Sequence, residues 1–115
     1  MIERLAAELE RFAVEREWEQ FHTPKNVAMA LTVEAAELLE VFQWLTPTES
    51  ADLSQKQRER VGEEMADVLN YLVRLSSLLD IDLEAVAFEK IEANRKKYPA
   101  EKVRGNAAKY TEYEE

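Results

Sequence analysis

Apolar residues recur at helical spacing along most of the chain, and this pattern predicts four long helices. We expect these helices to cover approximately residues 2–17, 24–45, 55–79 and 83–98. Two of the helix starts carry capping signals: Thr23 precedes a proline at the first helical position, and Ser54 begins a capping box with Gln57. We expect a polar loop at residues 47–53 and an extended arm at residues 100–115. The pattern therefore predicts an all-α fold, a four-helix bundle.

The second predicted helix is apolar on nearly every side. Of its 19 residues from Val27 to Leu45, 14 are apolar, which is more than a helix with one buried face requires. Glu34, Glu37 and Glu40 interrupt the run, and carboxylates would be costly in lipid, so we exclude a membrane span. The third predicted helix is also rich in apolar residues, and two such helices indicate contacts between subunits as well as an internal core. We therefore expect a homo-oligomer.

The composition removes several classes of protein. The chain has 115 residues, 46% of them hydrophobic, which suits a single domain. It has only 2 Gly and 3 Pro, so a phosphate-binding loop of the P-loop or Rossmann type is excluded. It has no Cys, which excludes disulfides, thiolate zinc sites and a cysteine nucleophile. The N-terminal segment lacks an apolar signal core, so we expect a cytoplasmic protein.

Charge is unevenly distributed along the chain, whose net charge is −9. Residues 1–89 carry 8 basic and 19 acidic side chains, whereas residues 90–109 carry 7 basic and 2 acidic ones. The acidic body would repel a phosphate backbone, so we do not expect a nucleic-acid partner. The basic segment suits a small polyanion, but basic side chains at the end of a helix also stabilise that helix by complementing its dipole. Both interpretations stay open at this point.

Two pairs of carboxylates are the strongest chemical signal in the sequence. Glu34 and Glu37 lie three residues apart on the second predicted helix, and Glu64 and Asp67 lie three apart on the third. Residues at this spacing share one face of a helix, so antiparallel packing would bring the two pairs together. Four such groups in a poorly solvated cleft need a counter-charge, and oxygen-only ligands suit Mg²⁺ or Mn²⁺. Zinc and di-iron sites are disfavoured because the chain has one His and neither motif contains it.

The acidic motifs and several segments around them resemble a known family. The motif from Glu34 to Glu37 and the motif from Glu64 to Asp67 are separated by 26 residues, and this arrangement resembles the all-α MazG-like nucleoside triphosphate pyrophosphohydrolases. The likeness is closer still to the dCTP pyrophosphatase branch of that family. It is carried by residues 15–22 (EREWEQFH), 38–44 (LLEVFQW), 64–72 (EMADVLNYL), 94–99 (NRKKYP) and 104–111. The resemblance covers approximately residues 2–112 and implies a single MazG-like domain over residues 1–115.

The resemblance implies roles for individual residues. It assigns Mg²⁺, with Mn²⁺ as a substitute, to the carboxylates Glu34, Glu37, Glu64 and Asp67. It places the base and sugar of a nucleotide against Trp18, His22, Trp44 and Tyr71. It assigns the phosphates to Asn94, Lys97, Arg104 and Lys109, of the same protomer or of a neighbouring one. Two positions depart from the family pattern, since Val33 stands in place of a second Glu and Leu9 in place of a His, and these leave the number of metal ions and the base preference open.

The activity that the resemblance implies is Mg²⁺-dependent hydrolysis of dCTP, or of a related or modified pyrimidine deoxynucleotide, to the monophosphate and pyrophosphate. Such an enzyme would sanitise the nucleotide pool and would assemble as a homotetramer or a dimer. A carboxylate would orient the attacking water, and we assign this role to Glu37 or Glu63. Three alternatives stay open: a MazG-like hydrolase for another base, a non-catalytic helical module with an acidic partner surface, and core packing of Trp44 and Tyr71.

Overall fold

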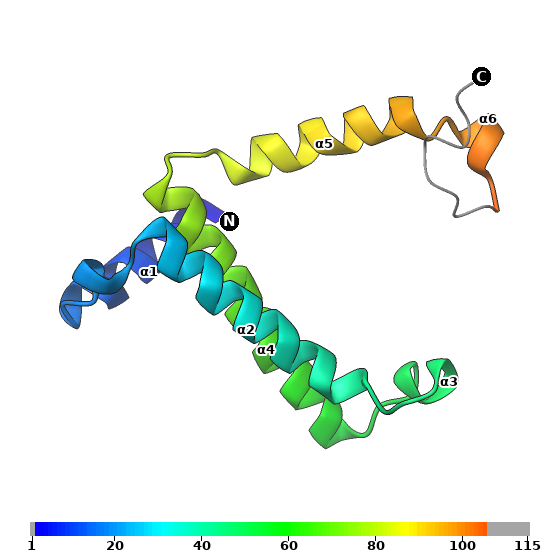
Figure 1. The fold of residues 1–115 in the computed structure, drawn as a ribbon, viewed down its shortest axis with the longest axis horizontal. Helices are drawn as coiled ribbons and strands as arrows, with labels where there is room; N and C mark the ends of the chain where they lie inside the picture. The colour runs from blue at the N-terminus through cyan, green and yellow to red at the C-terminus, as the bar shows by residue number, and fades with distance from the viewer. Residues whose placement is uncertain (1, 106–115) are drawn as a thin grey trace. The chain divides into compact units, whose positions relative to one another are not determined.

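The computed structural model describes residues 2–105, and all regular structure in this range is helical (Figure 1). The elements are α1 (Ile2–Glu15), the 3₁₀ turn η1 (Glu19–Phe21), α2 (Pro24–Phe42), α3 (Pro47–Ser50), α4 (Gln55–Leu78), α5 (Leu83–Lys97) and α6 (Ala100–Val103). The long helices α1, α2, α4 and α5 correspond to the four that the apolar pattern predicts. The predicted all-α class is confirmed.

Capping hydrogen bonds lie at the predicted helix starts. The Thr23 hydroxyl accepts a hydrogen bond from the Asn26 backbone N–H at 3.1 Å, at the start of α2. Ser54 and Gln57 form a reciprocal capping box at the start of α4, with distances of 3.2 Å and 2.8 Å. Asp82 caps α5 by accepting a backbone N–H at 3.1 Å. These bonds satisfy backbone donors that have no partner inside the helix, and α2 and α4 begin where their sequence signals lie.

A short helix, α3, lies where the sequence predicts a loop. Thr46 and Glu49 form a capping box with distances of 3.1 Å and 2.9 Å, and Pro47 occupies the first turn of α3. The prediction of a polar loop at residues 47–53 is therefore wrong for Pro47–Ser50, because Thr46 begins a new helix there. α2 itself ends at Phe42, before the predicted end at residue 45.

Two further boundaries differ from the predictions. α1 ends at Glu15 and not at Glu17, because Glu17 has a φ of 55°, in the left-handed region that an α-helix does not contain. The arm predicted as extended contains a helical turn at Ala100–Val103. The rest of this predicted arm, residues 106–115, lies outside the described residues.

The chain divides into two compact units, Met1–Ile81 and Asp82–Glu115. In the first unit, α2 and α4 run antiparallel side by side, and α1 also contacts α4 (Figure 1). Ala13 on α1, Val27 on α2 and Val73 on α4 are almost completely buried and form the core of this unit. α4 is thus the helix against which the other two long helices are placed.

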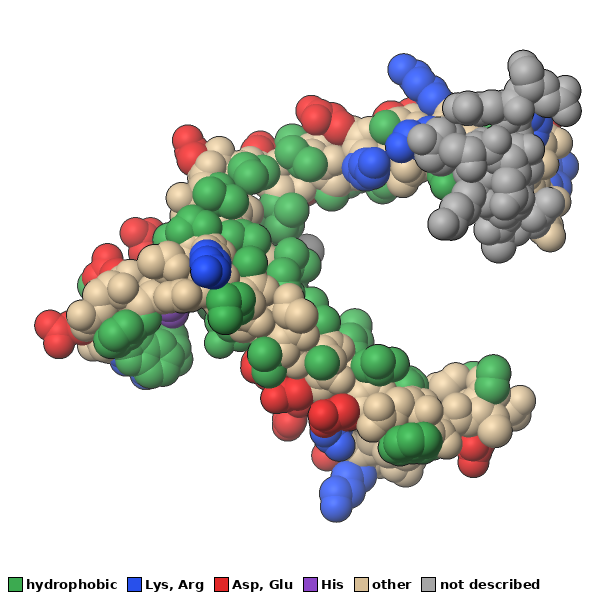
Figure 2. Space-filling model, viewed as in Figure 1, with side chains coloured by type: hydrophobic (Ala, Val, Ile, Leu, Met, Phe, Trp, Pro, Cys, Tyr) green, Lys and Arg blue, Asp and Glu red, His purple; other side chains and the backbone are tan. Residues whose placement is uncertain are grey.

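Much of the apolar surface of the first unit stays exposed in the single chain. On α2, the side chains of Met29, Val33 and Leu39 are more than half exposed, and each lies about 100° or more around the helix axis from Glu34. Figure 2 shows hydrophobic side chains along this helix. None of the helices among residues 2–105 is long and apolar enough to cross a membrane. Contacts between subunits through this surface stay a prediction.

The second unit contains α5 and α6, and no residue of either helix is buried. Val86, Phe88 and Ile91 on α5 are about half exposed or more, at 46–64%. The last turn of α5 carries basic residues at positions 95–97, where positive charge complements the helix dipole. α5 therefore combines an uncovered apolar surface with a basic C-terminal end.

Candidate functional site

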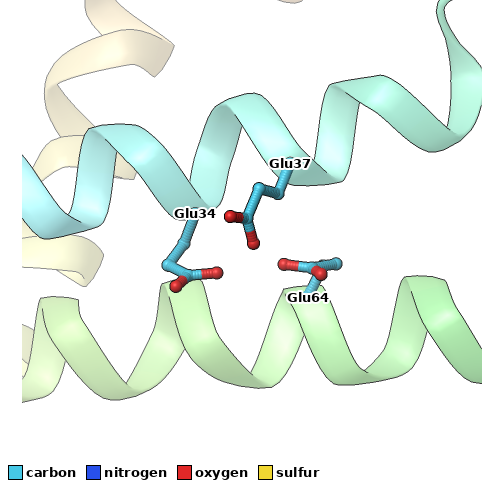
Figure 3. Close-up of side chains that lie close together, drawn as sticks. All are labelled: Glu34, Glu37 and Glu64. Atoms are coloured by element: carbon cyan, nitrogen blue, oxygen red, sulfur yellow. The ribbon is translucent and has the colours of Figure 1, made fainter.

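Three carboxylates converge between α2 and α4. Glu34 and Glu37 lie one turn apart on α2 and point toward α4, where Glu64 faces them (Figure 3). One carboxylate oxygen of each residue lies within 4.8 Å of the corresponding oxygens of the other two. Antiparallel packing of α2 and α4 thus brings together three of the four carboxylates in the two acidic motifs.

Burial makes this cluster electrostatically costly unless a cation or proton enters it. Glu34 Oε2 and Glu64 Oε2 are buried and have no hydrogen-bond partner among the described residues. Burial, the neighbouring Glu37 and Glu64 carboxyls and the charge of Asp67 raise the pKa of Glu34 to about 7. Burial also raises the pKa of Glu64, and the charges of Glu37 and Asp67 add to that rise. Near neutral pH the cluster therefore favours holding a proton or a metal ion.

The donor set of the cluster fits a hard divalent cation. All three converging groups are carboxylates, and Mg²⁺ and Mn²⁺ prefer oxygen ligands. A cation at this position would give the buried Glu34 and Glu64 oxygens the partner that they lack. The cluster is not neutralised by Arg60, which lies 3.5 Å from Glu40 instead. The residues present thus fit Mg²⁺ or Mn²⁺.

Two other predicted acidic residues lie beside the cluster. Asp67 is exposed, lies one turn along α4 from Glu64 and is not one of the three converging carboxylates, although its charge acts on Glu34 and Glu64. Glu63 is exposed and lies outside the pocket described next. The metal-binding role of Asp67 and the water-orienting role of Glu63 stay predictions.

A pocket of about 490 Å³ adjoins the carboxylate cluster. Trp18, His22 and Tyr71, three of the four residues predicted to meet the base and sugar, line it. Glu34 and Asp67 line the same pocket from α2 and α4. A flat apolar ligand could therefore lie against the aromatic side chains while a polyanionic part of it reaches the acidic cluster.

α1 supplies a wall of this pocket that the sequence does not assign to the site. Leu9 and Phe12 line the pocket, and Phe12 meets Trp18 edge to face with ring centroids 5.6 Å apart. The Arg16 guanidinium lies over the Phe12 ring, 3.7 Å from its centroid. The apolar stripe on α1 was the available signal, but such a stripe does not distinguish a core residue from a pocket residue. Leu9, which departs from the family pattern, is thus part of the pocket wall.

His22 is held in the pocket by a nearly buried arginine. Arg74 Nε donates a hydrogen bond to His22 Nδ1 at 3.1 Å, and the Arg74 residue is 8% exposed. Burial and the positive charge of Arg74 lower the pKa of His22. The sequence does not single out Arg74 as a site residue, although Arg74 continues the polar stripe of Glu64, Asp67 and Tyr71 along α4. That stripe was the signal that could have identified it.

The remaining predicted site residues lie outside this pocket. Trp44, just beyond the end of α2, is 87% exposed. Asn94, Lys97 and Arg104 belong to the second unit, where their side chains are exposed. Lys109 lies outside the described residues. Their contacts with a base or with phosphates stay predictions.

Known proteins resemble this chain in sequence and in fold. Residues 29–113 match the MazG-like family. The chain is 46% identical over 113 residues to dCTP pyrophosphatase 1 of Homo sapiens and 45% identical over 113 residues to that of Mus musculus. Each match covers 96% of this chain and 65% of the relative, so the chain spans just under two thirds of the length of these relatives.

The fold is also shared with a protein of known crystal structure. A pyrophosphatase from Archaeoglobus fulgidus superposes with a TM-score of 0.80 at 40% sequence identity, and the match covers 84% of this chain and 91% of that one. The family match extends over most of the chain and includes α4, with its acidic motif, as well as the acidic motif of α2. The chain therefore belongs to the MazG-like family.

Proposed function

We propose that this chain is a Mg²⁺-dependent nucleotide pyrophosphatase that hydrolyses dCTP, or a related or modified pyrimidine deoxynucleotide, to the monophosphate and pyrophosphate. One observation carries this proposal above the others. The buried and unpaired oxygens of Glu34 and Glu64 belong to a carboxylate cluster, and Glu34 also lines a pocket with Trp18 and Tyr71. A nucleoside triphosphate combines a flat base with a polyanion that binds metal, so its two parts match the two parts of this site.

Within this proposal, Glu34, Glu37 and Glu64 hold Mg²⁺, with Mn²⁺ as a substitute, and Asp67 joins them. The cation would supply the positive charge that neutralises phosphate oxygens and lowers the pKa of water. A carboxylate side chain orients the attacking water, and the place of Glu37 inside the cluster supports Glu37 over the exposed Glu63. In this proposal the acidic side chains therefore bind the cation and orient the attacking water.

The base and sugar are proposed to lie against Trp18, His22 and Tyr71. Stacking on an aromatic ring contributes about 1–3 kcal/mol per base, and the edge contact between Phe12 and Trp18 keeps the indole in place before a nucleotide binds. Asn94, Lys97, Arg104 and Lys109 are proposed to contact the phosphates, in agreement with the excess of basic residues over positions 90–109. We also propose that residues 1–115 form a single MazG-like domain.

We propose that further copies of the chain complete the protein, as a homotetramer or a dimer. The exposed Met29, Val33 and Leu39 on α2 support this assembly, because large apolar side chains gathered on one surface mark contacts with other proteins. Trp44 is also proposed to reach a base pocket, that of a neighbouring copy, since it is 87% exposed and does not line the pocket of its own chain. We place the protein in the cytoplasm, where thiols stay reduced and a chain without cysteine needs no disulfide for its fold.

A turnover panel tests the proposed activity. Common and modified nucleoside triphosphates would be incubated with the purified protein and Mg²⁺, and the monophosphate, pyrophosphate and inorganic phosphate would be quantified by chromatography. We expect pyrophosphate as the product and the highest kcat/KM for a cytosine deoxynucleotide. A preference for a purine would select the rival MazG-like hydrolase for another base. No turnover, together with no effect of Mg²⁺ or nucleotide on the melting temperature, would select the non-catalytic helical module.

A further inference from the structure

The contact between Arg74 and His22 fixes the protonation pattern of the imidazole. An arginine guanidinium offers only N–H donors and stays protonated at all ordinary pH values, so the atom that it contacts must accept a hydrogen bond. Arg74 Nε approaches His22 Nδ1 at 3.1 Å. Nδ1 therefore carries no proton, and the neutral ring carries its proton on Nε2.

Other charged groups around this pocket do not reverse this conclusion. α1 contributes Glu8, Arg11 and Glu15 to the lining, and Arg16 follows it. These residues form two ion pairs, Arg11 with Glu8 at 3.1 Å and Arg16 with Glu15 at 3.6 Å. α2 and α4 contribute Glu34 and Asp67. Among the described residues, only the Arg74 charge acts appreciably on His22, and it acts in the same direction as burial, lowering the pKa of the imidazole. A proton on Nδ1 would also point at the guanidinium.

The burial and the hydrogen bonding of Arg74 are those of a residue that positions another side chain. It is only 8% exposed, and no carboxylate within the described part of the chain lies within ion-pair distance of it. A buried cation without a carboxylate partner costs stability, so core packing alone gives no reason for an arginine here. Its one side-chain hydrogen bond in the described residues goes to His22, and both residues line the pocket with Trp18 and Tyr71.

We propose that Arg74 is a positioning residue that holds His22 in the Nε2–H form, so that the pocket offers a fixed hydrogen-bond donor and selects a base whose N3 accepts a hydrogen bond. For the substrate class, this rests on the proposed nucleotide hydrolysis. Cytosine has an unprotonated N3 that accepts a hydrogen bond, whereas N3 of uracil and thymine carries a hydrogen and donates. A fixed donor that faces N3 therefore favours cytosine, while an imidazole that is free to exchange its proton between the two nitrogens could serve either base at N3.

The tautomer can be measured directly because His22 is the only histidine in the chain. In ¹⁵N-labelled full-length protein, two-bond ¹H–¹⁵N correlation spectra distinguish a protonated from an unprotonated ring nitrogen. We expect an unprotonated Nδ1 and a protonated Nε2 in the wild-type protein, with a titration midpoint below the ordinary value of about 6.5. A proton on Nδ1 in the wild-type protein would overturn the proposal, and this measurement requires no variant to fold.

Variants then separate positioning from mere packing. Arg74→Met keeps the length of the side chain but removes the donor and the charge, and Arg74→Gln is a second choice if the first does not fold. In either variant we expect mixed tautomers and a titration midpoint that moves up toward about 6.5. Arg58→Met, on an exposed part of α4 outside the pocket, is the matched control and should leave the His22 spectrum unchanged. An unchanged tautomer and midpoint in a folded Arg74 variant would contradict the proposal.

Selectivity is measured on the same variants. We expect the ratio of kcat/KM for dCTP to that for dUTP to fall about tenfold in Arg74→Met, the size of one hydrogen bond, and to stay constant in Arg58→Met. If the wild-type protein hydrolyses no nucleotide, the proposed function fails. The spectra then still show whether Arg74 fixes the tautomer of His22. If the wild-type protein prefers dCTP and the ratio does not change in Arg74→Met, the proposed function holds and this inference is overturned.

Discussion

The two sides of α2 differ in a way that reverses the usual arrangement of a surface helix. Its inner side places Glu34 and Glu37 against α4, with one Glu34 oxygen buried and unpaired. Its outer side leaves Met29 and Val33 more than half exposed. A surface helix ordinarily buries its apolar stripe and exposes its charges. Each side of α2 is therefore incomplete in a single chain, because the inner side lacks a counter-charge and the outer side lacks a cover.

The difference indicates that α2 binds two kinds of partner, one on each side. Carboxylates that are buried together favour a cation, whereas exposed apolar side chains favour another apolar surface. We expect changes on the inner side to affect turnover and metal binding while leaving the assembly intact. Changes on the outer side should affect the assembly first. Substitutions on one side at a time can break this distinction or sharpen it.

The largest expected effect is on the inner side. Glu64→Gln removes one charge and little volume, and we expect it to lower kcat at least about a thousandfold, since the bound cation supplies several kcal/mol of charge stabilisation. Steady-state kinetics with Mg²⁺ and dCTP measure this effect, and circular dichroism and sedimentation should show an unchanged fold and assembly. Glu59→Gln, on the same helix but exposed and outside the pocket, is the matched control. Near-normal activity in both Glu64→Gln and Asp67→Asn would show that the metal assignment is wrong.

A charge on the outer side should act on the assembly. Met29→Glu places a carboxylate in the proposed contact between copies, and we expect the dissociation constant of the oligomer to rise about a hundredfold, because an unpaired charge becomes buried. Analytical ultracentrifugation over a range of concentrations measures the change. Thr48→Glu on α3 adds the same charge at an exposed position outside this surface and should leave the assembly intact. Equal dissociation constants for the wild-type protein and Met29→Glu would exclude this side of α2 as the interface.

A substitution of Trp44 tests whether this exposed side chain contacts the base in the pocket of a neighbouring copy. Trp44→Ala should raise KM for dCTP at least about tenfold, taking about 1.4 kcal/mol for one lost stacking face. We expect kcat to change less, because stacking is similar in the ground state and the transition state. Tryptophan fluorescence should also be quenched by a non-hydrolysable dCTP analogue in the wild-type protein. An unchanged KM in a variant that still assembles would remove Trp44 from the base pocket.

The smallest expected effect is the pH dependence of metal binding. The pKa of Glu34 is raised from 4.5 to about 7, so the metal-free folded protein holds a proton that the unfolded chain releases at lower pH. Without a cation, stability should therefore fall as pH rises from about 4.5 through about 7, and Mg²⁺ should oppose this fall. Because Mg²⁺ competes with that proton, its affinity should increase about threefold from pH 6.5 to pH 7.5. Calorimetry measures this ratio, and a ratio that stays the same in Glu34→Gln would show that another group is responsible.

The sequence predicts correctly those features that depend on geometry within a few residues, such as which side chains share one face of a helix. The helical period places Glu34 and Glu37 on one face, and the same rule places Glu64 on a face of α4, so their convergence requires only that the two helices pack antiparallel. Asp67 obeys the same spacing but is not among the three converging carboxylates, because side-chain rotamers and the angle between the helices decide which oxygens meet. The prediction of a loop after Thr46 was wrong, since a residue that follows one helix can also cap the next.

What the sequence by itself determined is therefore the set of long helices, the caps at Thr23 and Ser54 and the acidic faces of α2 and α4, all of which depend on hydrogen bonds and spacings within a few residues. Only the tertiary structure decided that α1 forms a pocket wall beside Trp18, and that Arg74 reaches His22, 52 residues away in the chain. Both outcomes depend on how α1 and the turn before α2 pack against α4. Such packing is a sum of many weak contacts between distant residues, and no local pattern in the sequence encodes that sum.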